Sequence, residues 1–138
     1  MKRILLLSHG SFAQGAKDAA TMLLGESDVL DCLGLYGDIE AFRAELRERL
    51  NVLKDSEQII VMADLRVGSP YSSALTMLDE MGLMQKSVVI SGFNLALVLQ
   101  LAMNGQVLTP EEIKEVMREA MEDAFAYEPE ACDGDEIL

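Results

Sequence analysis

The stretch that decides the fold lies near the N-terminus and reads Arg3-Ile4-Leu5-Leu6-Leu7-Ser8-His9-Gly10-Ser11. Its continuous apolar run is typical of a parallel β-strand that other elements cover on both faces. A secretory signal sequence would usually continue its apolar region for roughly 7–15 residues, but here polar residues follow directly after Leu7. We therefore predict a first strand that leads into a polar loop, and this loop holds the only histidine of the chain.

Strand-like and helix-like segments alternate after this stretch. Further apolar runs predict strands over residues 29–35, 58–63 and 88–91. Apolar residues at helical spacing, together with capping residues, predict helices over 13–24, after Asp38, from Ser69-Pro70 to Gly82, over 95–103, and from the capping box at Thr109 to about Phe125. This order predicts an α/β fold, a three-layer, doubly wound, mainly parallel sheet with helices on both faces. The 138 residues suit a single domain, with an acidic tail over about 128–138.

The balance of charges excludes some classes of partner. The chain has 11 basic and 24 acidic residues, a formal net charge of -13. Phosphate backbones are held by clustered Lys and Arg side chains, and anionic membrane surfaces attract basic segments. We therefore expect neither nucleic acid nor a lipid surface as the main partner. The apolar stretches are also too short for a membrane-spanning helix, which needs roughly 20 residues.

The cysteines indicate neither a metal site nor a disulfide framework. Cys32 and Cys132 lie far apart, and the chain has one histidine. A structural zinc site normally takes about four Cys or His ligands at short spacings. We therefore expect no metal, and a reducing cytoplasm is the simplest compartment for two distant cysteines.

Polar loops follow the predicted strands at one edge of the sheet, where open parallel sheets bind their ligands. His9 lies in the first loop, before Gly10-Ser11 and a helix. Gly68-Ser69 lies in the loop after the third strand and opens another helix, where the Ser69 hydroxyl can act as the cap. Free backbone N–H groups and the positive ends of the two helix dipoles could hold a phosphoryl group at this edge.

Asp64 offers His9 a chemical partner. It follows the third strand, and sheets of this kind often place the first and third strands side by side. Its carboxylate could then accept the Nδ1–H of His9, fix the tautomer and leave a free lone pair on Nε2, as a nucleophilic imidazole requires. Taken separately, the two residues also fit structural roles, as a hydrogen-bonded histidine and a turn-capping carboxylate.

These residues together resemble a known family. Ser8-His9-Gly10 follows the first strand, Asp64 with Val67-Gly68-Ser69-Pro70 follows the third, and Gly92-Phe93-Asn94-Leu95 follows the fourth. The set is similar to that of the mannose-family EIIA components of the bacterial phosphoenolpyruvate-dependent sugar phosphotransferase system (PTS). The resemblance extends over nearly the whole chain in the order and length of its elements.

The resemblance implies a function for the histidine loop. His9 would accept a phosphoryl group from the phosphocarrier HPr and pass it to an EIIB domain, with Asp64 as its hydrogen-bonding partner. The residues expected around the phosphate are Gly10, Ser11, Gly68 and Ser69. Neither a cofactor nor a metal takes part, and the carrier would be cytoplasmic, meeting the membrane only through a mannose-type permease complex.

A surface for the two partner proteins is expected around this loop. Its candidate residues are Phe12, Leu65, Arg66, Phe93 and Asn94. An acidic carrier favours partners with a basic face. The sequence departs from the family pattern in two places: Val67 precedes a single glycine, and Leu95 stands where the family often has proline.

The resemblance also implies a homodimer. In the family, the final strand crosses to the neighbouring subunit as an antiparallel edge strand, and residues 126–129 are the candidate for it. Many relatives continue through a linker into an EIIB domain, so a chain that stops here is expected to be a free-standing EIIA.

Two alternatives remain open at this stage. The first is an EIIA-type phosphoryl donor for a dihydroxyacetone kinase, which the motifs of the histidine loop barely separate from a sugar PTS. The second is a flavodoxin-like or receiver-like ligand-binding module in which His9 is passive. Aromatic residues make up 5% of the chain, with no Trp, and no acidic pair follows the first strand. Both facts disfavour this second alternative.

Overall fold

The computed structural model describes residues 1–129 and confirms the alternation of strands and helices. In chain order the elements are β1 (Lys2–His9), α1 (Phe12–Leu24), β2 (Leu30–Leu35), α2 (Ile39–Leu53), β3 (Gln58–Ala63), α3 (Ser69–Glu80), the short 3-10 helix η1 (Met84–Lys86), β4 (Ser87–Ser91), α4 (Leu95–Ala102) and α5 (Pro110–Met121). The strands form one sheet in the order β2-β1-β3-β4, and every neighbouring pair is parallel. The predicted α/β fold is thus confirmed.

β1 lies in the middle of this sheet, between β2 and β3. Ile4, Leu5, Leu6 and Leu7 are all fully buried, which is why this strand shows a continuous apolar run rather than an alternating one. Its last residues pair with both neighbours, Leu7 with Ala63 on β3 and His9 with Leu35 on β2. The expected side-by-side placement of the first and third strands is therefore present.

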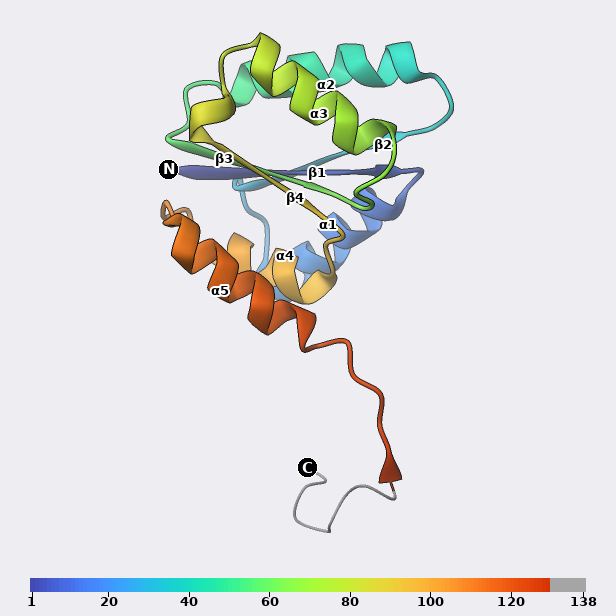
Figure 1. Ribbon diagram of the computed structural model, residues 1–138, viewed down its shortest axis with the longest axis vertical. Coiled ribbons are helices and arrows are strands. Elements are labelled where there is room, and N and C mark those ends of the chain that lie inside the picture. The colour runs from blue at the N-terminus through green and yellow to red at the C-terminus, as the bar shows by residue number, and fades with distance from the viewer. Residues whose placement is uncertain (130–138) are drawn as a thin grey trace.

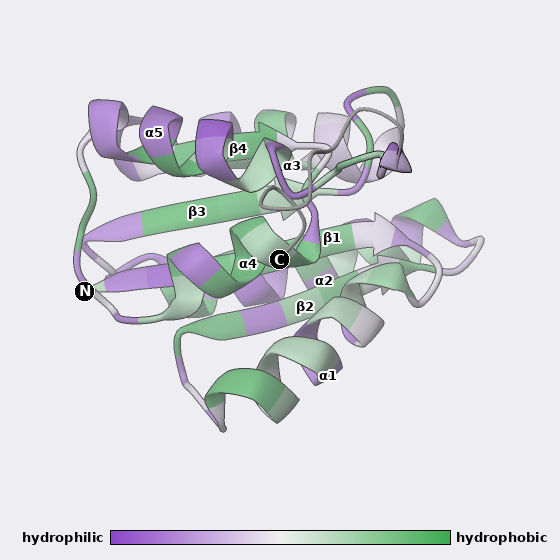
Figure 2. Ribbon diagram, turned by 90° about the horizontal axis from the view of Figure 1, so that it is seen from below, coloured by the Kyte–Doolittle hydropathy of each residue, from purple (hydrophilic) through white to green (hydrophobic). Residues whose placement is uncertain are grey.

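Helices cover both faces of the sheet and give the three layers seen in Figure 1. α2 and α3 pack over one face, on a cluster that includes Leu5 and Leu7. α1, α4 and α5 pack over the other, on a cluster that includes Ile4 and Leu6. Successive strand residues point to opposite faces, so β1 supplies both clusters. Figure 2 shows that the strands are largely apolar and that much of α5 is hydrophilic, whereas α1 is mostly apolar.

Most helix boundaries follow the predicted capping residues. The Asp38 side chain caps α2, and Thr109 with Glu112 forms the predicted capping box of α5. The expectation for Ser69 was wrong, because Gly68 occupies the N-cap position of α3 and no side-chain capping bond is made there. α5 also ends earlier than expected, at Met121 rather than near Phe125.

The segment after α5 leaves the body of the molecule as an extended coil (Figure 1). Phe125 and Tyr127 on it are 77% and 56% exposed. Residues 126–129 form no β-strand within this chain, so the crossing strand stays a prediction, and positions 130–138 of the expected acidic tail lie outside the described residues. Within residues 1–129, no helix has the length and apolar character needed to cross a membrane.

Candidate functional site

The candidate site lies at the edge of the sheet where the strands end. His9 is the last residue of β1, and Asp64 follows the last residue of β3. Because the two strands are parallel neighbours in register, with Leu7 opposite Ala63, both side chains emerge at the same edge. The backbone N–H of Asp64 donates to the Leu7 carbonyl at 3.1 Å, which extends the pairing by one residue.

Asp64 holds His9 at two points. Oδ2 accepts a hydrogen bond from the His9 backbone N–H at 2.9 Å and lies 3.0 Å from Nδ1 of the ring. Oδ1 accepts from the N–H of Leu65 at 2.9 Å, which fixes the carboxylate itself. An ionised carboxylate only accepts hydrogen bonds, so a neutral His9 ring held in this way would carry its proton on Nδ1 and keep the lone pair on Nε2.

Exposure of the two side chains separates their roles. The His9 side chain is 46% exposed, whereas that of Asp64 is 12% exposed. The Asp64 carboxylate is therefore largely shielded from solvent while it positions the ring, and the His9 ring itself is accessible to solvent. The structure brings together the two residues from which we expect the chemistry.

Gly68 lies beside Nε2 of His9. A Cβ placed on Gly68 would come within 3.1 Å of that nitrogen. α3 begins at the next residue, Ser69, and the first N–H groups of a helix carry a partial positive charge. The free nitrogen of the ring therefore faces a helix N-terminus that favours an anion.

The first loop differs from the expectation. The N–H of Gly10 is not available to a phosphate, because it donates to the carbonyl of Leu35 at 2.7 Å and continues the pairing of β1 with β2. Ser11 occupies the N-cap position of α1, but its hydroxyl makes no capping bond. Gly68, directly before α3, lies beside Nε2, whereas the N–H of Gly10 is used within the sheet.

Ser8, the residue before His9 at the end of β1, is a residue of the site that sequence reasoning missed. Its side chain is fully buried, accepts a hydrogen bond from the N–H of Ala13 at 2.7 Å, and donates to the carbonyl of Gly10 at 3.2 Å. These bonds fix the path of the chain around His9. The available signal was a hydroxyl between an apolar strand and a glycine, a few residues before a helix.

A shallow apolar hollow of about 370 Å³ lies next to the site, lined by Phe12, Asp64, Leu65, Gly92 and Phe93. Phe12 and Leu65 are 56% and 57% exposed. Phe93 is only 6% exposed and belongs to the core, with its ring centroid 5.5 Å from that of Phe12. Of the three apolar residues expected on a partner surface, Phe93 therefore acts mainly as the support for Phe12.

Asn94 and Arg66 are placed differently from each other. Asn94 caps α4, since Oδ1 accepts from the N–H of Leu97, and its Nδ2 donates to the Ala120 carbonyl of α5, both at 2.9 Å. Its amide is thus used inside the fold rather than offered to a partner. Arg66 is exposed in the loop before α3.

Within residues 1–129, no group of three or more His, Cys, Asp or Glu side chains is arranged to hold a metal ion.

Comparisons with known proteins find similar sequences and folds among PTS IIA proteins. A curated relative is the sorbose-specific EIIA component of the PTS from Klebsiella pneumoniae, 28% identical over 116 residues that cover 82% of each chain. Among solved structures, the PTS IIA protein associated with the fucose utilization operon of Streptococcus pneumoniae superposes with a TM-score of 0.80, at 28% identity over 95% of this chain and 96% of that one. The mannose/sorbose-specific IIA subunit from Enterococcus faecalis shares the fold, with a TM-score of 0.75 at 21% identity over 93% and 96% of the two chains.

The sequence profile of one family matches residues 3–121, which span every strand and helix described above except the first residue of β1. That family is EIIA-man, described as the PTS system fructose IIA component. The chain therefore belongs to the EIIA-man family of PTS components.

Proposed function

We propose that this protein is the EIIA phosphoryl carrier of a sugar PTS, taking a phosphoryl group from phosphorylated HPr onto Nε2 of His9 and passing it to an EIIB domain. The observation that carries the proposal is the hydrogen bond of 3.0 Å between Nδ1 of His9 and Asp64. It leaves Nε2 as the basic nitrogen of an exposed ring. Membership of the EIIA-man family supports the same assignment.

The transfer needs little beyond position and charge compensation. The Nε2 lone pair attacks the phosphorus of the donor phosphohistidine, a new N–P bond forms, and the N–P bond to the donor imidazole breaks. The His9 ring then carries a positive charge, because both of its nitrogens are substituted or protonated. Asp64 stabilises that charge through Nδ1–H, and the reverse sequence delivers the phosphoryl group to the next protein.

The negative charge of the phosphoryl group meets the start of α3. Gly68 and Ser69 lie at this helix terminus, and Arg66 is exposed two residues before Gly68. Helix N-termini and guanidinium groups both favour phosphate oxygens. A carrier with two partners requires this binding to be reversible.

The partner surface consists of the exposed apolar side chains beside His9. Phe12 and Leu65 flank the shallow hollow, and they offer a small apolar area to a partner that must leave again. The net charge of -13 favours partners with a basic face and a fast, salt-sensitive approach. We place this exchange in the cytoplasm, with contact to the membrane only through the permease.

The proposed dimer exchanges the segment after α5. Phe125 and Tyr127 are exposed on a segment that leaves the body of its own chain. A second copy can bury these rings if residues 126–129 join its sheet as an antiparallel edge strand. Light scattering at low concentration distinguishes the dimer from a monomer.

A phosphorylation cascade tests the proposal. The protein is incubated with phosphoenolpyruvate, Enzyme I and HPr, and acid-labile phosphate is measured on the wild type and on His9→Ala. The proposal expects phosphate on the wild type alone, and transfer that survives in His9→Ala would contradict it. Adding an EIIB domain or a dihydroxyacetone kinase to the phosphorylated protein then separates the two acceptors. Phosphate leaving only toward the kinase would replace the sugar assignment by the alternative role.

A further inference from the structure

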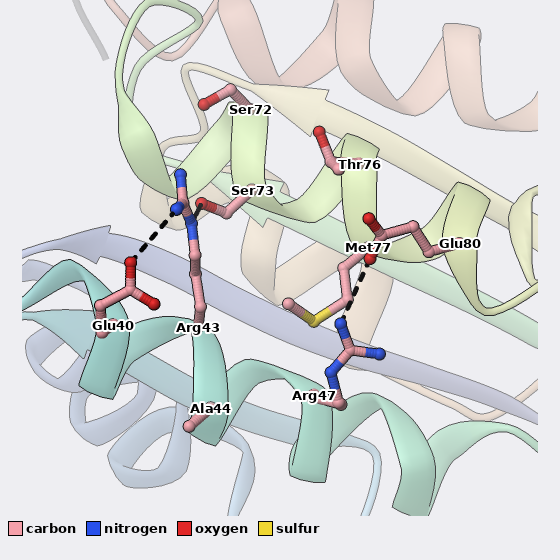
Figure 3. Close-up of a pocket in the computed structure, with 9 residues that line it drawn as sticks. All are labelled: Glu40, Arg43, Ala44, Arg47, Ser72, Ser73, Thr76, Met77 and Glu80. Carbon is pink, nitrogen blue, oxygen red and sulfur yellow. Dashed lines mark hydrogen bonds and ion pairs between the residues drawn. The ribbon is translucent and has the colours of Figure 1, made fainter.

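A groove with polar walls, separate from the apolar hollow beside His9, lies on the outer side of the molecule between α2 and α3 (Figure 3). Its volume is about 500 Å³, within the range of small-molecule sites. Neither His9 nor Asp64 lines it. Ser72 in its wall lies one helical turn after Gly68 and donates its N–H to the Gly68 carbonyl at 3.2 Å.

Two arginines form one wall of this groove. Arg43 and Arg47 are four residues apart on α2, so their side chains lie on the same face of the helix, and both extend toward α3 in Figure 3. Nε of Arg43 donates to Oγ of Ser73 at 3.3 Å, and Ser73 is only 4% exposed. This bond steers the guanidinium across the groove, where Nη1 of Arg43 also forms an ion pair with the exposed Glu40 at 3.8 Å.

Hydroxyl groups form the opposite wall. Ser72, Ser73 and Thr76 lie on one side of α3, and the thioether of Met77 lies deeper between the two helices (Figure 3). Ser72 and Thr76 are exposed. Each hydroxyl can both donate and accept, so this wall suits the hydroxyl groups of a small polar molecule.

The ion pairs between the arginines and the carboxylates of the groove are weak. Glu40 lies 3.8 Å from Nη1 of Arg43, and Glu80 lies 3.2 Å from Nη2 of Arg47. These carboxylates are 82% and 55% exposed, and exposed ion pairs are weak. A phosphate dianion accepts two parallel hydrogen bonds from one guanidinium, so it can displace the carboxylates from the arginines. The released carboxylates can then accept hydrogen bonds from the hydroxyl groups of the ligand.

We propose that the groove between α2 and α3 binds a small phosphate monoester that carries hydroxyl groups, of the class of phosphorylated sugars. Arg43 and Arg47 hold the phosphate, and Ser72, Thr76 and Glu80 contact the hydroxyl groups. The chain has a net charge of -13, so most of its surface repels anions. The two adjacent guanidinium groups of this groove, which face hydroxyl groups, offer an anion a local binding site. The site is independent of phosphoryl transfer by His9.

The test is a titration of the full-length, ¹⁵N-labelled protein with glucose 6-phosphate, followed by amide chemical shifts. Glucose and inorganic phosphate serve as separate probes. We expect saturable shifts at Ser72, Ser73 and Thr76, an affinity for glucose 6-phosphate above that for inorganic phosphate, and no binding of glucose. Arg43→Gln and Arg47→Gln should each weaken binding about tenfold, the loss of one charge-assisted contact. The matched variant Arg118→Gln, which alters an exposed ion-paired arginine on α5, should bind as the wild type does.

Several results would overturn the proposal. Shifts confined to His9 and Ser69 would place the phosphate at the transfer site instead. Equal affinity for inorganic phosphate would remove the role of the hydroxyl wall, and unchanged binding in Arg43→Gln and Arg47→Gln would remove the site. His9→Ala separates the two proposals, because binding in the groove persists in this variant whether or not the wild type carries phosphate on His9.

Discussion

Gly68 is packed against the ring of His9. A Cβ at this position would lie 2.9 Å from Cε1 and 3.1 Å from Nε2, and its backbone has a φ of +147°. Only glycine meets both conditions, because a side chain would strain the backbone and displace the ring. Asp64 holds the imidazole from the Nδ1 side and Gly68 confines it on the Nε2 side, so the two residues together set the direction in which the free nitrogen points.

Gly68→Ala should therefore reduce phosphoryl transfer more than it reduces stability. Displacing a reacting group by about 1 Å can lower a rate about a hundredfold, while the strained backbone lowers the free energy of unfolding by about 1–3 kcal/mol. Transfer from phosphorylated HPr and urea denaturation measure the two effects. Gly25→Ala is the control, because Gly25 also has a positive φ, of +89°, but its Cβ position is open. Equal transfer rates in the two variants would contradict this role of Gly68.

Asp64→Asn should leave the fold intact and slow transfer about a hundredfold or more, by analogy with other imidazoles that lose their carboxylate. The neutral amide neither fixes the Nδ1–H tautomer nor stabilises the cationic phosphohistidine. Rapid-quench measurement of phosphate uptake gives the rate, and the amide spectrum reports the fold. Asp79→Asn, at an exposed residue of α3, is the matched change of charge. A wild-type rate in Asp64→Asn would remove Asp64 from the mechanism.

Ser8→Ala tests the loop that carries His9. It removes the acceptor of the Ala13 N–H, and a buried donor without a partner costs about 1–3 kcal/mol. We expect a loss of that size in the free energy of unfolding. The paired variant Ser11→Ala should cost much less, since the Ser11 hydroxyl makes no capping bond. Equal losses in the two variants would show that the Ser8 hydroxyl does not hold the loop.

Lys2 gives the unfolding equilibrium a dependence on pH. It is 1% exposed, its Nζ donates to the Asn104 carbonyl at 2.8 Å, and burial lowers its pKa below the ordinary value of 10.5. In the window between the folded and unfolded pKa values, the unfolded chain binds more protons, so the free energy of unfolding rises with pH. Urea denaturation from neutral pH to about pH 10 should therefore show the wild type gaining stability relative to Lys2→Met. A constant difference between the two proteins would contradict this.

Much of this architecture could be predicted from the sequence. The limits of β3 and the caps at Asp38 and Thr109 follow from local patterns of apolar and capping residues. The meeting of His9 and Asp64 followed from one rule, that the first and third strands of such sheets are often neighbours. Each of these features depends on a short segment or on the topology of a whole class of folds.

The remaining features depend on contacts between distant segments. The N–H of Gly10 donates to the Leu35 carbonyl because the pairing of β1 with β2 extends to this residue. No local sequence pattern predicts how far that pairing extends. The burial of Phe93 depends on the packing of α1 against α4. The close approach of Gly68 to His9 requires the positions of two loops at once, and the sequence shows only that a glycine is present.

NMR of the phosphorylated protein identifies the nitrogen atom of His9 that carries the phosphoryl group. After incubation with phosphoenolpyruvate, Enzyme I and HPr, the ¹⁵N shifts and couplings of the His9 ring report which nitrogen carries phosphorus. We expect the phosphoryl group on Nε2, with Nδ1 still protonated and bound to Asp64. Phosphate on Nδ1, or a His9 ring without phosphate after the full reaction, would contradict the account.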